Sequence, residues 1–290
     1  MKDKLRDPLY LERHMVAVAV SRGLQKVPWY DAHFLKYYAV ARKYLKEVAP
    51  HLLDDFVEGF VPLRTPHDFQ APRIEGLLDS ETLEEIRAIT RSIPEGNLEN
   101  HEIADFGRHV VHDHPRFEKL QRDLQPRVEE LLGRELVAGY NFLSLYGPQG
   151  VCNPHLDHPF SMYTLDLCID QSGDWPIYFS KVIDWSDPDP VLSVPPAEVR
   201  DHEDLNFQPH VLRPNEALIF SGSGQWHYRN PISPGGFCNL LFLHYYPKGA
   251  EDLVRPHRWA RHFGWAELEP LCDLLPADEL NGEPDETVAS

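Results

Sequence analysis

The chain has 290 residues, of which 42% are hydrophobic, and this excludes a simple disordered polymer because the chain can bury a sizeable core. Its 26 prolines, 17 glycines and 11% aromatic residues favour short strands and turns over a helical bundle. With 28 Lys and Arg against 46 Asp and Glu, the net charge of −18 argues against a surface for nucleic acid or anionic membrane.

The first third of the sequence predicts helices. Residues 29–50 space apolar side chains three and four apart, and Pro50 ends the pattern. A second helix is predicted after the capping candidates Asp79 and Ser80, running to Pro94. A third is predicted over 116–132, where Gly133 supplies the stop signal. These helices form a predicted framework, residues 1–134.

From Glu135 onward the pattern changes to short apolar or alternating runs between turn residues. No helical pattern separates these runs, so they predict a mainly antiparallel sandwich or barrel rather than βαβ units. We assign this predicted core to residues 135–265. The runs cover residues 135–147, 160–170, 175–183, 210–222 and 237–247.

The end of the chain predicts an acidic tail over residues 266–290, partly disordered, since 267–290 carry eight acids and no Lys or Arg. The four cysteines lie far apart without a CxxC pair, and the N-terminal segment lacks the apolar run of a signal peptide. A reducing cytoplasm is therefore the expected location.

The strongest chemical signal is His155-Leu156-Asp157, followed 72 residues later by His227. In an extended segment residues i and i+2 point the same way, so His155 and Asp157 can reach one ion together. Two imidazoles and one carboxylate can occupy one face of an octahedral metal and leave three positions open, which suits ferrous iron. We predict that these three residues bind the metal.

Two other interpretations of the pattern stay open. His202 and Asp204 also satisfy HxD, but they lie in an acidic, proline-flanked stretch only 25 residues before His227, too close for the intervening strands of a barrel. Alternatively, the segment around Asp157 is an ordinary surface turn in which the carboxylate caps its own backbone.

Around these motifs the chain resembles the Fe(II)/2-oxoglutarate-dependent oxygenases, over roughly residues 136–247. The resemblance implies an α+β fold: a double-stranded β-helix (jelly roll, cupin-like) core with N-terminal helices packed on it. It implies the ligands His155, Asp157 and His227, and the co-substrates 2-oxoglutarate and O2. It also implies that Tyr146 lines the co-substrate pocket and that Thr164 faces the barrel interior.

One position departs from the family pattern. Family members commonly carry Arg or Lys ten residues after the second histidine, to bind the distal carboxylate of 2-oxoglutarate, and here Phe237 stands there. Arg229, two residues after His227, is predicted to replace it, because it faces the same side of a regular strand and its guanidinium can grip a carboxylate. Asp166 would hold Arg229 in place, and Lys181 is the second choice for the anchor.

The sequence around Arg229 carries a further likeness. The block His227-Tyr228-Arg229, with the later Leu243-His244-Tyr245, looks like the family branch whose second histidine sits in an HWR or HYR motif. The alternative to an anchoring role is a surface or substrate-contacting ion pair of Arg229.

Together these features predict a non-heme iron dioxygenase that uses 2-oxoglutarate to hydroxylate, or otherwise oxidise a C–H bond of, a small biosynthetic intermediate. We expect no nucleic acid or membrane partner, and the oligomeric state is open. The alternatives are an iron oxygenase of the same fold that does not use 2-oxoglutarate, and a cupin-like binding domain without activity.

Overall fold

The computed structural model describes residues 3–22, 33–188, 190 and 193–275. Contacts divide the chain into two compact units. The described residues of 1–27, 34–61 and 249–290 form a helical unit, and those of 28–33 and 62–248 form a β unit. The boundaries expected from sequence, at 134 and 265, differ from this contact division and stay a prediction about the organisation of the domain.

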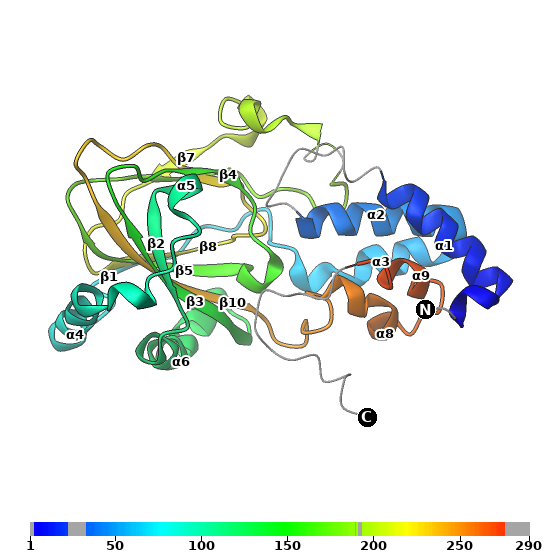
Figure 1. Cartoon of the computed structure of the whole chain (residues 1–290), viewed down its shortest axis with the longest axis horizontal. Coiled ribbons are helices and arrows are strands. Elements are labelled where there is room, and N and C mark those ends of the chain that lie inside the picture. The colour runs from blue at the N-terminus through cyan, green and yellow to red at the C-terminus, as the bar shows by residue number, and fades with distance from the viewer. Residues whose placement is uncertain (1–2, 23–32, 189, 191–192, 276–290) are drawn as a thin grey trace. The chain divides into compact units, whose positions relative to one another are not determined.

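The helical unit joins the two ends of the described chain (Figure 1). Its core is aromatic: Phe60 packs against Tyr38 with ring centroids 4.9 Å apart and against Trp259 at 5.1 Å. Trp259 lies far along the sequence from the other two, so packing rather than chain proximity defines the unit. Its helices are α1 (Pro8–Ser21), α2 (His33–Val48), α3 (Leu53–Gly59), α8 (Trp259–Phe263) and α9 (Glu269–Cys272).

Two antiparallel sheets make up the β unit (Figure 1). The larger has the strand order β1-β8-β5-β10-β3-β2 and the smaller has the order β4-β9-β6-β7. The larger sheet comprises β1 (Arg73–Glu75), β2 (Arg108–His112), β3 (Leu136–Tyr146), β5 (Tyr163–Gln171), β8 (Glu216–Phe220) and β10 (Cys238–Pro247). The smaller comprises β4 (Cys152–His155), β6 (Ile177–Phe179), β7 (Gln208–His210) and β9 (His227–Arg229). This is the predicted double-stranded β-helix.

Among the described residues, the β unit also contains the helices α4 (Ser80–Ser92), α5 (Ile103–Phe106) and α6 (Pro115–Leu132). Helix α4 contacts β5 and α6 contacts β3. The predicted start of α4 is confirmed, since Asp79 caps this helix by accepting a hydrogen bond from the Thr82 N–H at 2.7 Å. Gly133 ends α6 with φ of 66°, a conformation that glycine adopts without steric cost.

The interior of the β unit is filled from both sheets by one hydrophobic cluster. Residues that alternate along β10 and β5 point inward, as the pleat of a strand requires. Because both faces of β5 and β10 are covered, their residues are mostly buried. The cluster contains Tyr146, Cys168, Trp175, Ile177, Phe179, Leu212, Leu218, Phe220, Ile232, Cys238, Leu240 and Phe242.

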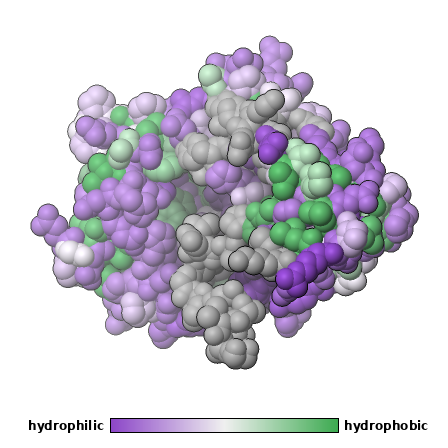
Figure 2. Space-filling model, turned by 45° about the vertical axis from the view of Figure 1, so that its right-hand side comes forward, coloured by the Kyte–Doolittle hydropathy of each residue, from purple (hydrophilic) through white to green (hydrophobic). Residues whose placement is uncertain are grey.

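Hydrophilic residues predominate on the face shown in Figure 2, where apolar residues gather in separate patches. Among the described helices, none has the length and apolar character needed to cross a membrane. In the predicted acidic tail, residues 269–272 form α9 and Pro270, Leu271 and Cys272 are buried, so this part is packed. The predicted disorder beyond it falls on residues 276–290, outside the described residues.

Candidate active site

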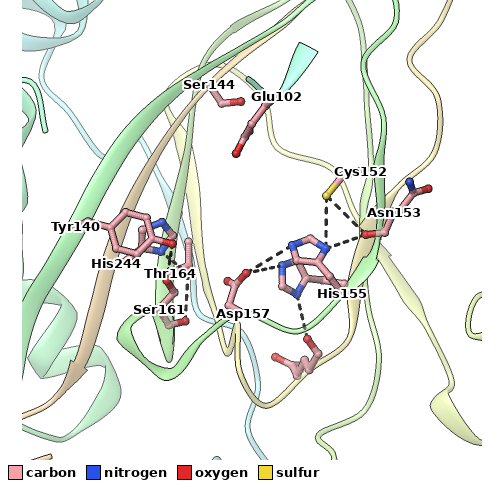
Figure 3. Close-up of polar contacts among 12 residues, drawn as sticks. Glu102, Tyr140, Ser144, Cys152, Asn153, His155, Asp157, Ser161, Thr164 and His244 are labelled. Atoms are coloured by element: carbon pink, nitrogen blue, oxygen red, sulfur yellow. Dashed lines mark hydrogen bonds and ion pairs between the residues drawn. The ribbon is translucent and has the colours of Figure 1, made fainter. Parts of the chain in front are cut away.

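Two strands of the smaller sheet bring His155, Asp157 and His227 together. Figure 3 shows His155 and Asp157 facing each other. His155 ends β4 and pairs in register with His227, the first residue of β9. Asp157 lies two residues beyond His155 and its N–H donates to the Gly222 carbonyl at 2.9 Å. One potential ligand atom from each of the three residues lies within 4.8 Å of the others. Convergence of the three side chains, expected from the spacing, is therefore present.

Hydrogen bonds fix which imidazole nitrogens face the carboxylate. His155 Nδ1 lies 2.8 Å from the Asn153 carbonyl oxygen, and His227 Nδ1 lies 3.1 Å from that of Gln225. Because a carbonyl oxygen only accepts, Nδ1 carries the proton in each neutral ring and Nε2 offers a lone pair. The two Nε2 atoms lie 3.5 and 3.6 Å from Asp157 Oδ1.

Electrostatics favour ligand-competent forms of two of these groups. Burial, reinforced by the neighbouring His155, lowers the pKa of His227 to about 4, so its ring is neutral near pH 7. Burial opposes ionisation of Asp157, but His227 and His155 outweigh it and hold the pKa of the carboxyl below its usual range. A metal requires these unprotonated states.

The donor set fits ferrous iron. Two imidazole Nε2 atoms and one carboxylate oxygen form the facial set typical of non-heme Fe(II) sites, which leaves coordination positions for other ligands. Lone pairs that face a carboxylate repel it unless a proton or a metal ion lies between them, and Cys152 and Asp157 raise the pKa of His155 despite its burial, so a proton can take this place until a metal displaces it. Within the described residues, no other group of His, Cys, Asp or Glu converges in this way, and that includes His202 and Asp204.

Arg229, the predicted anchor, lies inside the barrel two residues along β9 from His227. Its side chain is 3% exposed, and its Nη2 donates to Asp166 Oδ2 at 2.7 Å. Its Nη1 donates to the Trp175 carbonyl at 2.6 Å, and the guanidinium carbon lies 4.9 Å from the Trp175 ring centroid. The alternative of a surface ion pair does not fit this burial.

Tyr146 contacts the same tryptophan, with ring centroids 4.7 Å apart. Its hydroxyl accepts a hydrogen bond from Arg108 Nη1 at 2.7 Å, and Arg108 also pairs with Glu102. Arg108 was not among the predicted site residues. The feature of the sequence that could have indicated Arg108 is the alternation of side chains along β2, which places Arg108 on a buried position.

Thr164 is fully buried, with its Oγ1 2.9 Å from His244 Nδ1. Burial lowers the pKa of His244 to about 4, so this imidazole is neutral. The Tyr140 ring lies tilted against that of His244, with ring centroids 4.3 Å apart, and the Tyr140 hydroxyl lies 3.0 Å from Ser161 Oγ. Tyr140 and Tyr146 share one face of β3, so period-two alternation connects the two residues.

Two sequence-selected positions lie away from the interior. Lys181 is exposed beyond the end of β6, and its backbone N–H donates to the Leu205 carbonyl at 2.8 Å. Phe237 is 40% exposed, while the next residue, Cys238, is fully buried at the start of β10. Arg229 therefore lies inside the barrel, and the second-choice anchor Lys181 does not.

Figure 3 shows that Tyr140, Glu102, Asp157 and His155 direct their polar ends toward one space. Tyr140 comes from β3 of the larger sheet, whereas His155 comes from β4 of the smaller one. The space therefore lies between the two sheets, next to the three potential ligands.

Solved structures provide the comparison, since no protein-family model and no curated protein matches the sequence. The non-heme alpha-ketoglutarate-dependent carbocyclase SnoK from nogalamycin biosynthesis aligns with a TM-score of 0.51 at 14% identity, over 73% of this chain and 90% of SnoK. HygX from Streptomyces hygroscopicus, with nickel, 2-oxoglutarate and hygromycin B bound, aligns with a TM-score of 0.48 at 13% identity, over 62% of this chain and 83% of HygX. A Pseudomonas putida prolyl-4-hydroxylase aligns with a TM-score of 0.46 at 12% identity, over 67% of this chain and 97% of the hydroxylase. The likeness to SnoK establishes that the chain has the double-stranded β-helix fold of that enzyme.

Proposed function

We propose that the protein is an Fe(II)- and 2-oxoglutarate-dependent dioxygenase that hydroxylates, or otherwise oxidises a C–H bond of, a small organic substrate. The observation that carries this proposal is the convergence of two imidazole Nε2 atoms on Asp157 beside a buried arginine. Bound iron, with O2, would supply oxidation of the substrate while 2-oxoglutarate is converted to succinate and CO2. For hydroxylation the atoms balance, since one oxygen atom enters the product and the other enters succinate.

The chain's own residues bind and orient in this scheme. His155, Asp157 and His227 would hold the metal through three positions on one face. Two residues of strand advance about 6.6 Å, so Arg229 lies farther along β9 than His227, at a distance suited to the far end of a five-carbon diacid. Tyr146 would line this co-substrate pocket, and Thr164 would hold His244 at its wall. The surrounding apolar cluster excludes water from the reacting groups.

The likeness to SnoK supports a small biosynthetic intermediate as the substrate, because that enzyme belongs by its name to nogalamycin biosynthesis. We also propose that the protein works in the cytoplasm. All four cysteines are free, which is the state expected in that reducing compartment.

An anaerobic titration tests the proposal without requiring the substrate. Fe(II), followed by 2-oxoglutarate, is added to wild type while the visible charge-transfer band of the chelate is recorded, and melting temperature is measured in parallel. We expect the band and a rise in melting temperature, since a ligand that binds only the folded state stabilises it. Both responses should be lost in Asp157→Ala and His227→Ala.

Different failures identify the alternatives. Iron binding without a 2-oxoglutarate response, and no succinate under air, would indicate an oxygenase that does not use this co-substrate. Equal Fe(II) affinity in wild type and Asp157→Ala would indicate a binding domain without a functional metal site.

A further inference from the structure

In the buried pair of Arg229 and Asp166, one carboxylate oxygen makes no hydrogen bond to the described part of the chain. Asp166 is fully buried, and its Oδ2 accepts from Arg229 Nη2. Its Oδ1 is also buried and has no hydrogen-bond partner among the described residues. A buried carboxylate oxygen normally accepts hydrogen bonds, so this one can take a further partner, either a ligand or a water molecule.

The positive charge of Arg229 is balanced by the negative charge of Asp166 only as long as no second anion binds to Arg229. One guanidinium and one carboxylate sum to zero in an interior where both side chains are at most 3% exposed. A second carboxylate on Arg229 would leave a net negative charge away from water, and two adjacent carboxylates cannot both ionise at low cost. One proton restores the balance.

We propose that Asp166 takes up one proton when 2-oxoglutarate binds, and that its protonated carboxyl donates a hydrogen bond to the distal carboxylate held by Arg229. This inference rests on the proposed function. It makes Asp166 a co-substrate-binding residue in addition to a partner of Arg229. A protonated carboxyl gains a donor, so the acid and the guanidinium together can hold a carboxylate through both of its oxygens.

The surroundings of Asp166 favour its neutral form. Burial raises the pKa of its carboxyl above the ordinary value despite Arg229. In register, Asp166 pairs with Phe242 of β10 and Leu218 of β8, which carry no charge. Arg229 is the one cation among the groups that shift its pKa.

Of the titratable groups around the pair, the Tyr146 phenol and the Cys168 thiol are neutral near pH 7, whereas Cys152, which pairs in register with Arg229, has its thiol pKa lowered by His155 despite burial. Burial raises the pKa of the Tyr146 phenol, and the contact with Cys238 raises that of the Cys168 thiol. On the outer side of β5, Arg87 of α4 donates to the Ile169 carbonyl at 3.3 Å. Within the described residues, Asp166 and Cys152 are therefore the groups near Arg229 that could take the proton, and the Asp166→Asn variant distinguishes them.

Calorimetric titration of the anaerobic, Fe(II)-loaded protein with 2-oxoglutarate tests this inference. Repeating the titration in buffers of different ionisation enthalpy, between pH 6 and 9, gives the number of protons taken up. Where Asp166 is ionised in the free protein, wild type should approach one proton per 2-oxoglutarate, and Kd should rise about tenfold per pH unit. Asp166→Asn should take up none, and its affinity should not depend on pH.

Asp170→Asn, on the same strand but only half-buried, is the matched control and should behave as wild type. Difference infrared spectra of wild type provide a second measurement that needs no variant: the C=O band of a protonated carboxyl should appear when 2-oxoglutarate is added. Binding without proton uptake and without this band would overturn the inference and leave the proposed function intact. Absence of any 2-oxoglutarate binding would overturn both.

Discussion

Gly222 is the residue on which the geometry of Asp157 depends most directly. Its carbonyl accepts from the Asp157 N–H at 2.9 Å, and its own N–H donates to the Met162 carbonyl at 3.0 Å. A Cβ at this position would collide with Asp157 Oδ2 and with the backbone oxygen of Ser161. The absence of a side chain therefore permits the carboxylate to lie where both imidazoles can reach the same ion.

Gly222→Ala is expected to displace Asp157. We predict a loss of Fe(II) affinity of about 10- to 100-fold, the range seen when supporting contacts of a metal site are disturbed. Overpacking should also lower the free energy of unfolding by about 1–3 kcal/mol. Anaerobic Fe(II) titration and urea unfolding measure the two effects. Gly173→Ala is the control, since nothing lies within 4 Å of a Cβ there, and equal losses in both variants would contradict the explanation.

At the scale of elements, β10 carries a register irregularity between Leu243 and Tyr245, next to His244. Helix α6 satisfies the backbone there. Gln121 Nε2 donates to the His244 carbonyl at 2.7 Å, and Gln121 Oε1 accepts from Asn141 Nδ2 at 3.0 Å. The same glutamine thus bonds both strands, so α6 holds the position of His244.

Gln121→Leu should remove both hydrogen bonds while keeping much of the side-chain volume. Each buried group left unsatisfied costs about 1–3 kcal/mol, so we expect a loss of at least about 2 kcal/mol in the free energy of unfolding. Urea unfolding followed by circular dichroism measures it. Glu130→Leu, on an exposed position of the same helix, should change stability by less than about 0.5 kcal/mol. A Gln121→Leu variant as stable as this control would show that water replaces the lost bonds.

The long elements of the chain could be predicted from sequence, and most of the shortest ones could not, although β6 lies within the predicted run 175–183. β3, β5 and β10 and the helices α4 and α6 carry many residues of one period and clear end signals. β1, β7 and β9 have three residues each, too few to show alternation. Helix α1 went unnoticed although Asp7 caps it and Pro8 follows at the first helical position.

The same limit applies to the candidate site. His155, Asp157 and His227 were predictable because metal chemistry restricts residue type and spacing, and Arg229 because it follows His227 by one strand period. Arg108 and Tyr140 come from other strands of the larger sheet. Their approach depends on how the two sheets close, which local patterns do not encode.

At the scale of the whole molecule, the two ends of the described chain share one hydrophobic core. Trp259 is fully buried, and its ring centroid lies 5.7 Å from that of Phe34 and 5.7 Å from that of Phe56. Its indole N–H donates to the Leu253 carbonyl at 2.8 Å. The residues after β10 are thus part of a core with α2 and α3.

Trp259→Ala should lower the free energy of unfolding by about 3–5 kcal/mol, because it removes a large buried ring and leaves a cavity. Trp265→Ala serves as a control, since Trp265 is only half-buried and stacks on Phe263 with centroids 4.6 Å apart. Trp265→Ala should lower the free energy of unfolding by clearly less than Trp259→Ala. Thermal unfolding followed by circular dichroism compares the two, and equal losses would mean that Trp259 does not anchor this core.

The location of Arg229 also determines which turn of the barrel can tolerate inserted residues. His227 and Arg229, the proposed ligand and the proposed anchor, lie on one short strand, so the proposed function does not need the turn of residues 233–236, where Ser233, Pro234 and Gly235 are exposed. Engineers could therefore insert residues into that turn, to attach a label or a fused peptide, while the spacing between the two binding groups stays set by the strand itself.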